Sequence, residues 1–262
     1  MAAYENIGCE TCLATTIIFM QNQLFTEVSF CHSDDMELVL MAEAGVFLPT
    51  QTTSLLIQAV AKATTGQHSI LDLGCGTGVV GLSLYQQGLV RPPIYASDLS
   101  LASVRCCQIN HARYSCEADV RNGSLFEPWA GEQFDIIVDD VSGIAEEIAV
   151  ISPWFQGVPC ETGADGLALV SSILQKAPRF LNEGGRFFFP VLSLSDVDLL
   201  LSLASNSFTT VKQIVRQEWP LPLELKEHLP LLRNLANEGR IQLQERFGMV
   251  TCFTEIYCAY NA

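Results

Sequence analysis

A run of closely spaced glycines behind an acidic residue is the part of the chain best suited to hold a ligand. The run extends from Asp72 to Gly78, after the short apolar stretch 69–73 and before a helical pattern over 79–87. Glycines let the backbone turn tightly and let a ligand come close to it. The N–H groups at the start of the following helix can then hold a polar group. Contacts to the ligand are expected from Gly74, Cys75, Gly76 and Gly78.

The acid at the start of this run distinguishes between two nucleotide ligands. Gly76, Gly78 and Gly81 satisfy the Gly-x-Gly-x-x-Gly pattern of dinucleotide sites. The carboxylate of Asp72, however, would repel a pyrophosphate and attract a cationic ligand. S-adenosylmethionine has no phosphate and carries an ammonium and a sulfonium group. It is therefore the predicted cofactor, and NAD is the alternative.

Residues that follow the next two expected strands are placed to contact the rest of such a ligand. Asp98 ends the second strand, beside Leu99, and its carboxylate can accept hydrogen bonds from both ribose hydroxyls. Ser124 and Leu125 follow the third strand, where we expect the edge and the face of the adenine. The alternative for Asp98 is a helix cap, and the alternative for Ser124 is an ordinary turn.

Apolar runs that alternate with helical patterns from residue 49 onward indicate the fold that positions these residues. Nearly continuous apolar strands are typical of a parallel sheet covered on both faces, and ligands bind outside the carboxyl ends of such strands. We predict an α/β, Rossmann-like fold with a seven-stranded, mostly parallel sheet and helices on both faces. The expected strands are 69–73, 93–98, 118–122, 134–139, 186–191, 209–215 and 249–260, and the expected helices are 50–65, 79–87, 100–112, 165–181 and 194–204.

The residues before this pattern are richer in β-forming side chains. The runs 12–20 and 24–31 predict a hairpin, and a shorter run after them predicts a third strand. We therefore expect a β-rich N-terminal extension over 1–48 and an S-adenosylmethionine-binding domain over 49–262. The stretch 218–247 is expected to form a helical lid, with a surface helix or a dimer contact as alternatives.

The glycine run and Asp98 together resemble the cofactor motifs of class I S-adenosylmethionine-dependent methyltransferases. Within that class the chain is most similar to the small-domain and protein-glutamine N5-methyltransferase branch. The resemblance implies a methyl transfer from S-adenosylmethionine. The segments that carry the branch resemblance, within residues 45–215, are Phe47-Leu48-Pro49 with Thr53 and Leu56, Gly163-Ala164-Asp165-Gly166-Leu167, and Gly184-Gly185.

The chain departs from this branch after the expected strand 134–139. The branch places Asn or Asp, two prolines and an aromatic residue there, and these groups hold a planar amide or exocyclic amine. This chain has Asp140-Val141-Ser142-Gly143, which keeps the first acceptor and lacks the prolines and the ring. The resemblance therefore implies the cofactor and the reaction, but it does not extend to a planar-nitrogen acceptor.

Asp140 is the predicted catalytic residue, and it is also expected to touch the cofactor. Methyl transfer from a sulfonium is an in-line displacement, so the protein chiefly supplies alignment and a dry pocket. A hydroxyl or thiol acceptor must lose a proton, and Asp140 follows the strand nearest the transferred methyl. Asp139 and His228 are the alternative bases. Trp154 and Phe155 are expected either to form an aromatic wall or to pack within their loop.

Charge and composition limit the partners. The chain has 29 acidic and 14 basic residues, a net charge of −15, and this charge repels a phosphate backbone. A small molecule or a protein side chain is therefore the expected acceptor, and nucleic acid is disfavoured. No stretch is apolar for long enough to suggest a membrane span. We expect a cytoplasmic protein with reduced cysteines. No metal is expected at Cys9 and Cys12, because no second C-x-x-C or H-x-x-x-H accompanies them, and Cys31-His32 is the alternative pair that could complete such a site.

Three functions remain open on the sequence alone. The first is an active methyltransferase. The second is a protein that binds S-adenosylmethionine without catalysis, which the altered segment after Asp139 permits. The third is an NAD-dependent oxidoreductase that uses the literal glycine pattern.

Overall fold

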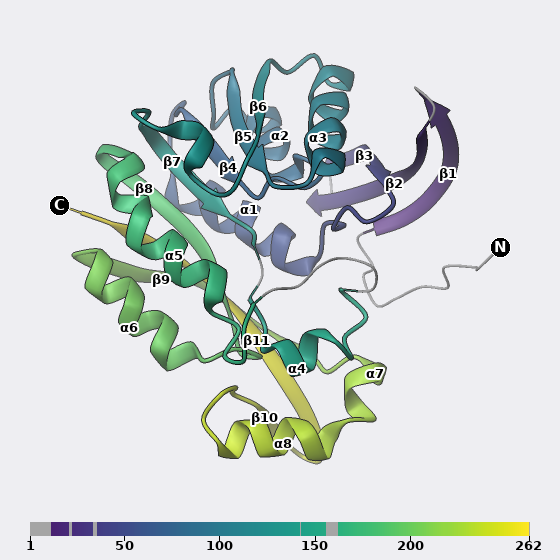
Figure 1. The fold of residues 1–262 in the computed structure, drawn as a ribbon, viewed down its shortest axis with the longest axis vertical. Coiled ribbons are helices and arrows are strands. Elements are labelled where there is room, and N and C mark those ends of the chain that lie inside the picture. The colour runs from purple at the N-terminus through teal and green to yellow at the C-terminus, as the bar shows by residue number, and fades with distance from the viewer. Residues whose placement is uncertain (1–11, 21–22, 34–35, 142, 156–161, 262) are drawn as a thin grey trace. The chain divides into compact units, whose positions relative to one another are not determined.

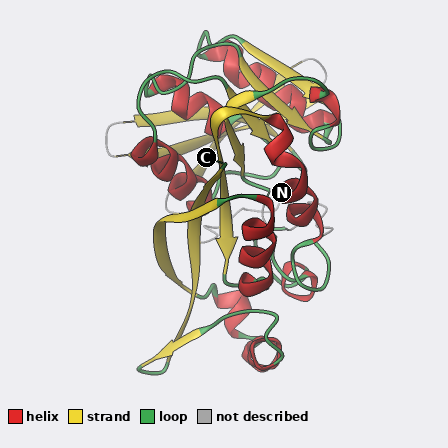
Figure 2. Cartoon of the chain, turned by 90° about the vertical axis from the view of Figure 1, so that its left-hand side faces the viewer, coloured by secondary structure: helices red, strands yellow, loops and turns green. Residues whose placement is uncertain are grey.

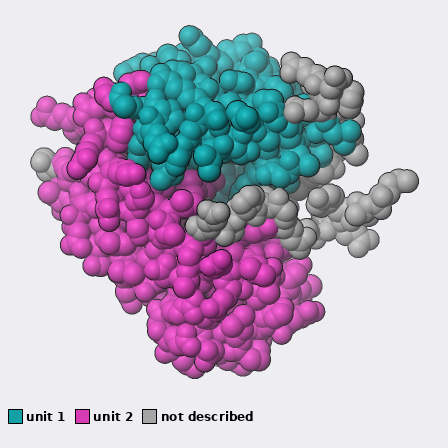
Figure 3. Space-filling model, viewed as in Figure 1, with its two compact units in different colours: residues 1–130 teal, residues 131–262 magenta. Residues whose placement is uncertain are grey.

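The computed structural model describes residues 12–20, 23–33, 36–141, 143–155 and 162–261. The chain divides into two compact units, Met1–Ala130 and Gly131–Ala262, which Figure 3 distinguishes by colour. Each unit is described by itself. The predicted boundary near residue 48 stays a prediction.

The first unit begins with a three-stranded antiparallel sheet. β1 (Cys12–Met20) pairs with β2 (Gln23–Ser33), and β2 pairs with β3 (Met36–Glu43). Val28 and Phe30 are both buried on β2, because residues two positions apart on a strand face the same side. The predicted N-terminal hairpin and third strand are confirmed.

The rest of the first unit alternates strands and helices. β5 pairs in parallel with both β4 and β6, so the loops that follow these three strands lie at one edge. α3 packs on β5 and β6 and also on β3, and α2 packs on β4 and β5 (Figure 1). Side-chain caps start two of the helices, from Thr50 and Ser100. The elements are α1 (Gln51–Ala63), β4 (Ile70–Leu73), α2 (Val79–Gln86), β5 (Ile94–Asp98), α3 (Leu101–Arg113) and β6 (Ala118–Asn122).

The second unit combines one parallel strand pair with antiparallel ones. β7 (Phe134–Asp139) is parallel to β8 (Leu181–Leu192), and β11 (Met249–Tyr260) runs antiparallel to β8. β11 also pairs with β9 and with β10, the short strand of the hairpin near the bottom of Figure 2. The remaining elements are α4 (Glu146–Ala149), α5 (Ala168–Lys176), α6 (Val197–Ser207), β9 (Thr210–Pro220), α7 (Leu223–Lys226), α8 (Leu229–Asn237) and β10 (Gln244–Arg246).

Some boundaries in the second unit differ from those expected. The helix expected over 165–181 starts at Ala168, because Gly166 has a positive φ of 80° and Asp165 Oδ1 accepts a hydrogen bond from Leu167 N. It ends at Lys176, and a 3₁₀ turn that contains a proline follows over Ala177–Phe180. Capping by Asp196 moves the start of α6 to Val197. These shifts change element lengths and leave the order of elements as expected.

The strands β4 to β9 and β11 correspond to the seven strands expected, and the α/β, Rossmann-like class is confirmed. β9 extends to Pro220, so the first residues of the proposed lid, 218–220, are strand. α7 and α8 follow and bury Leu225, Leu232 and Leu235 in an apolar cluster with residues of α4. No helix in the described part of the chain combines the length and hydropathy that a membrane crossing needs.

Candidate functional site

The glycine loop after β4 is held in place by its own backbone. Gly74 N and Cys75 N both donate to the carbonyl oxygen of Ser97 on β5, at 2.8 and 3.0 Å. Gly78 N donates to Cys75 O at 2.7 Å and closes a tight turn. Gly74, Gly76 and Gly78 have positive φ values of 68°, 52° and 76°, a region that favours glycine. The loop is thus a fixed turn anchored to the neighbouring strand.

Two glycines of this region also lack room for a side chain. A Cβ on Gly78 would lie 2.6 Å from Cys107 Sγ and 2.7 Å from His111 Cε1, both on α3. A Cβ on Gly81 would lie 2.6 Å from the Ile94 side chain on β5. Close packing of loop, helix and strand therefore requires glycine at both positions.

The carboxylate of Asp72 contacts the backbone in the first turn of α2. Its side chain is buried, and Oδ2 accepts a hydrogen bond from Gly81 N at 3.1 Å. Gly81 is in the first turn of α2, where backbone N–H groups otherwise have no partner within the helix. The protein's own carboxylate thus engages a donor that a pyrophosphate would use. This placement supports the electrostatic argument for a phosphate-free ligand.

Asp98 connects the glycine loop with the start of α3. Its Oδ2 accepts from Gly76 N at 3.0 Å, and its Oδ1 accepts from Ser100 N at 2.8 Å. The side chain is half-buried. Each carboxylate oxygen can accept more than one hydrogen bond, so these contacts leave acceptor capacity for a ligand. The N-cap of α3 is Ser100, so Asp98 does not fill the capping role considered for it.

Asn122, at the end of β6, is a residue of this site that the sequence analysis did not identify. Its amide donates to the carbonyl oxygens of Asp98 and Leu99, at 3.0 and 2.9 Å. It therefore orients the backbone on which the Asp98 carboxylate stands. Leu99 itself is 74% exposed. Its exposure places its side chain on the surface, where a bound ligand can cover it.

The residues expected near the adenine follow β6 in the same unit. Ser124 and Leu125 are half-buried, and Leu125 has a positive φ of 49°. Ser97 Oγ donates to Leu125 O at 3.3 Å, which joins this turn to the end of β5. The described hydrogen bonds therefore link the three loops after β4, β5 and β6.

Asn110 on α3 is a second residue that the sequence analysis did not identify. It is fully buried, and Oδ1 accepts from Met41 N at 2.7 Å. Its Nδ2 donates to Met41 O at 3.0 Å and to Thr77 O at 2.9 Å. One amide thus joins the N-terminal sheet, α3 and the glycine loop.

Replacing Asn110 with leucine is expected to lower the free energy of unfolding by about 2 kcal/mol, because three buried backbone groups lose their partner. Urea denaturation followed by circular dichroism would measure the change. The matched control is Gln108→Leu, an exposed position on the same helix, whose effect should stay within about 0.5 kcal/mol. Equal stabilities for the two variants would contradict this role for Asn110.

The predicted catalytic residue lies in the second unit, directly after β7. Asp140 is half-buried, whereas Asp139 is fully buried. Asp139 Oδ1 accepts from Val141 N at 2.9 Å, and Oδ2 has no hydrogen-bond partner among the described residues. Burial raises the pKa of Asp139 from 3.8 to about 8, against the effect of the Val141 bond. The two adjacent acids therefore differ in environment, and the more accessible one is Asp140.

The raised pKa of Asp139 predicts how stability depends on pH. The fold favours the neutral acid, so its stabilising contribution is complete below pH 3.8 and is lost as the pH rises through 8. Between pH 6 and 8 we expect the unfolding free energy of the wild type to fall by about 2 kcal/mol relative to Asp139→Asn, which cannot ionise. Urea titrations of both proteins at several pH values would show it. Parallel pH profiles would refute the buried neutral acid.

The loop after Asp140 leaves no room for a side chain at Gly143. A Cβ there would fall onto the carbonyl oxygen of Gly166. Thr162 Oγ1 donates to Ile144 O at 2.6 Å and adds a second link between the two segments. Residue 142 lies outside the described residues. The position at which the related branch has its aromatic ring is therefore closed by backbone.

The other residues considered near this loop have structural surroundings. Trp154 and Phe155 pack on the apolar cluster that contains Ile144 and Ile148, which favours loop packing over an exposed aromatic wall. His228 is exposed and precedes α8. The structure describes neither Cys9 nor the side chain of Cys12.

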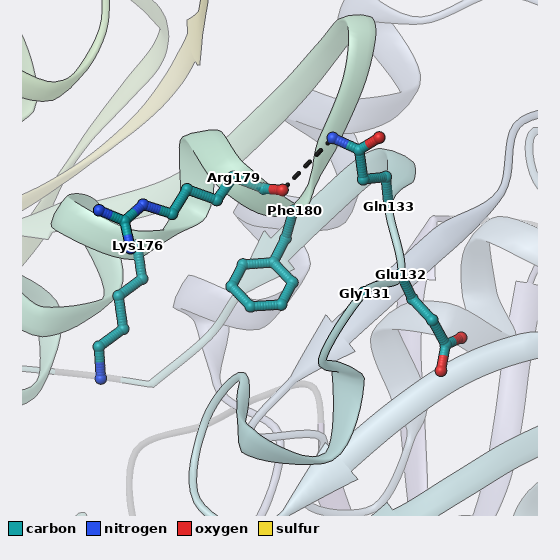
Figure 4. Close-up of a pocket in the computed structure, with 6 residues that line it drawn as sticks. All are labelled: Gly131, Glu132, Gln133, Lys176, Arg179 and Phe180. Atoms are coloured by element: carbon teal, nitrogen blue, oxygen red, sulfur yellow. Dashed lines mark hydrogen bonds between the residues drawn. The ribbon is translucent and has the colours of Figure 1, made fainter.

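A surface hollow of about 380 Å³ lies in the second unit at the amino end of β7 (Figure 4). Gln133 Nε2 donates to Arg179 O at 3.3 Å across it. None of the predicted site residues lines the hollow. Its lining residues are Gly131, Glu132, Gln133, Lys176, Arg179 and Phe180.

Comparison with known proteins agrees with this arrangement. Residues 37–140, from β3 to Asp140, match the family described as "Methyltransferase small domain". The chain is 25% identical to a release factor glutamine methyltransferase of Geobacter sulfurreducens, over 62% of this chain and 58% of that protein. It is 24% identical to a ribosomal protein L11 methyltransferase of Staphylococcus haemolyticus, over 68% of this chain and 57% of that one. The chain thus spans less than two thirds of these relatives.

Solved structures share the fold at low sequence identity. A 16S rRNA N2 G1207 methyltransferase of T. thermophilus, in complex with AdoMet and guanosine, superposes with a TM-score of 0.58 at 17% identity. That match covers 91% of this chain and 51% of the other. A ribosomal protein L11 methylase of Lactobacillus delbrueckii gives 0.54 at 14% identity, over 87% of this chain and 97% of the other. These likenesses show the fold, and the family match over the glycine loop agrees with the resemblance found in the sequence: residues 37–140 are similar to the small-domain family of class I S-adenosylmethionine-dependent methyltransferases.

Proposed function

We propose that this protein transfers a methyl group from S-adenosylmethionine, bound against the glycine loop of the first unit. The observation that carries the proposal is the pair of acids around that loop. Asp72 accepts a hydrogen bond from Gly81 N at the start of α2, and Asp98 accepts one from Gly76 N in the loop itself. A cationic, phosphate-free nucleoside suits such a site better than a dinucleotide.

The chain offers a distinct group for each part of the cofactor. The loop Gly74–Gly78 would hold the amino-acid end, with Cys75 in its turn, and Asp98 would accept the ribose hydroxyls. Leu99, Ser124 and Leu125 would surround the adenine. Bound S-adenosylmethionine supplies an activated methyl carbon for in-line displacement. The protein's own contribution is to align the acceptor and to exclude water.

Asp140 is proposed to contact the cofactor and to take the acceptor's proton. A base must lie within hydrogen-bond reach of the proton it removes, and it must be ionised at the working pH. Burial favours the neutral form of Asp139, whereas Asp140 is more accessible. The difference between these neighbours supports Asp140 as the base.

The acceptor is proposed to be a small molecule or a protein side chain other than a planar amide. Gly143 packs against the Gly166 carbonyl, so an aromatic ring for stacking has no place there. The net charge of −15 opposes the approach of a nucleic acid. One of the similar solved structures is that of a 16S rRNA methyltransferase, so the test includes RNA as the competing class of acceptor.

Transfer of tritiated methyl groups would test these statements. The full chain would be incubated with labelled S-adenosylmethionine and, in separate reactions, a release factor, ribosomal protein L11, a 16S rRNA fragment and a panel of small hydroxyl, thiol and amine compounds. We expect label in a protein or small-molecule acceptor and none in the release-factor glutamine. Labelled glutamine or RNA would overturn the acceptor class. Cofactor binding without transfer to any acceptor would favour a non-catalytic binding protein.

A reducing compartment such as the cytoplasm is the proposed location. Seven cysteines of the described residues are unpaired, and six of these are buried. Buried thiols behave as small apolar groups, and they persist in reducing compartments. Mass spectrometry of protein alkylated directly on cell lysis would show whether these thiols are free.

A further inference from the structure

Two cysteines and a histidine lie close together where the glycine loop packs against α3. Cys75 belongs to the loop, and Cys107 lies on α3, where both pack in one buried cluster with Ala96. His111 Nδ1 is 3.5 Å from Cys107 Sγ and 2.9 Å from Cys107 O. His111 is 1% exposed, and its Nε2 has no hydrogen-bond partner among the described residues. The methyl-transfer proposal assigns no role to Cys107 or to His111.

The surroundings of the two thiols are unequal. Interaction with the Cys75 thiol lowers the pKa of Cys107 to about 6 despite burial, and the bond and charge of His111 act in the same direction. Interaction with Cys107 and burial raise the pKa of Cys75 well above its ordinary value. Asp98 opposes ionisation of both thiols, and Asp72 opposes that of Cys75. Cys107 is therefore the more readily ionised thiol of the pair, and Cys75 the less readily ionised one.

We propose that Cys107 and Cys75 form a peroxide-sensitive dithiol site in which Cys107 is the attacking sulfur and Cys75 the resolving one. The Cys107 thiolate attacks a hydroperoxide oxygen, so that an S–O bond forms, the O–O bond breaks and the leaving oxygen takes up a proton. The Cys75 sulfur then attacks the sulfenic acid, an S–S bond forms and water leaves. Two thiols are oxidised by two electrons, and the peroxide is reduced to an alcohol, or to water, with a second molecule of water.

A disulfide between Cys75 and Cys107 would affect the ligand site, because backbone hydrogen bonds fix the conformation of the glycine loop. Cys75 O accepts the bond that closes the turn, and Cys75 N is tied to Ser97. A disulfide fixes the separation and direction of its two Cβ atoms. Gly78 already packs against Cys107 and His111 so closely that a Cβ does not fit. We therefore expect oxidation to shift the loop, and this consequence, unlike the disulfide itself, rests on the proposed cofactor site.

The disulfide can be tested without any cofactor. Reduced full-length protein would be treated with hydrogen peroxide, alkylated, digested with trypsin and analysed without reduction. Cleavage after Lys62, Arg105 and Arg113 places Cys75 in peptide 63–105 and Cys107 in peptide 106–113. We expect these peptides to be linked, and dithiothreitol to separate them. Cys106→Ser, the matched control, should keep the link, since the pKa of this neighbouring thiol is raised to about 12 by burial. Cys107→Ser should abolish it.

The effect on the ligand needs a second measurement. Calorimetry with S-adenosylhomocysteine is expected to show an affinity about tenfold lower after oxidation, restored by dithiothreitol. Unlinked peptides in the oxidised wild type, or a link that survives in Cys107→Ser, would overturn the dithiol site. A linked protein with unchanged affinity would overturn its regulatory effect. Reduced protein that fails to bind S-adenosylhomocysteine would count against the proposed function and would leave the peptide result standing.

Discussion

Asp140→Ala is expected to lower the rate of methyl transfer by about 10²–10⁴-fold, the usual contribution of a positioned general base. Asp140 follows β7 and is more accessible than its fully buried neighbour Asp139. The glycine loop belongs to the first unit and keeps its own hydrogen bonds. We therefore expect the affinity for S-adenosylhomocysteine to change little, because Asp140 is proposed as only one of several cofactor contacts.

Single-turnover transfer to the acceptor found in the tritium assay would measure this effect, with calorimetry as the parallel readout. Asp198→Ala, which removes an exposed acid in the first turn of α6, is the matched control and should transfer at the wild-type rate. An alanine variant of Asp140 that retains full turnover would show that this acid is only structural. Loss of cofactor affinity equal to the loss of rate would assign it to binding alone.

Asp98→Ala is expected to weaken S-adenosylmethionine binding by about 1–3 kcal/mol, because the ribose hydroxyls would lose their proposed acceptor. The structure adds a second reason for a loss. The same carboxylate holds Gly76 N and Ser100 N, so its removal also loosens the loop. Asp98→Asn keeps one acceptor oxygen and should fall between the wild type and the alanine variant.

Calorimetric titration with S-adenosylhomocysteine would give these affinities. The control is Asp119→Ala on the adjacent strand β6, where the carboxylate pairs with Arg121 at the surface. We expect its affinity to equal that of the wild type. If Asp98→Ala binds as tightly as Asp119→Ala, the ribose role of Asp98 is wrong.

The glycine loop was predictable because its determinants are local. A buried strand, three glycines within five residues and a helix follow one another directly, and each limits the backbone of the next. Asp98 was predictable for the same reason, since it ends the following strand. The structure adds the direct bond between Asp98 and Gly76, which crosses from one loop to the next.

Asn110 was not predictable from the sequence. In the sequence it is one polar residue within a helix, and nothing nearby marks it as buried. Its partner Met41 lies 69 residues away, so the contact exists only after the N-terminal sheet packs on α3. The contact between Gly143 and Gly166 was equally unpredictable. The need for glycine at residue 143 arises only when these two loops, which are distant in the sequence, pack together.

Asp139 and Asp140 show how far periodicity alone goes. Asp139 is the last residue of β7 and Asp140 is the first residue after it, so the pattern alone did not say which acid would be the more buried. The structure identifies it as Asp139, and burial explains its raised pKa. The helix expected over 165–181 is shorter in the structure, because Gly166 has a positive φ and Pro178 ends the helix early. Both residues are local signals against a helix, but the apolar pattern of the segment outweighed them in the prediction.

Calorimetry of the reduced wild-type protein with S-adenosylhomocysteine and, separately, with NAD tests most directly which ligand the acidic glycine loop accepts. The account predicts a dissociation constant on the order of micromolar for S-adenosylhomocysteine. It predicts no heat of binding for NAD, because Asp72 already holds the helix donor that a pyrophosphate needs. Binding of NAD with no response to S-adenosylhomocysteine would contradict it.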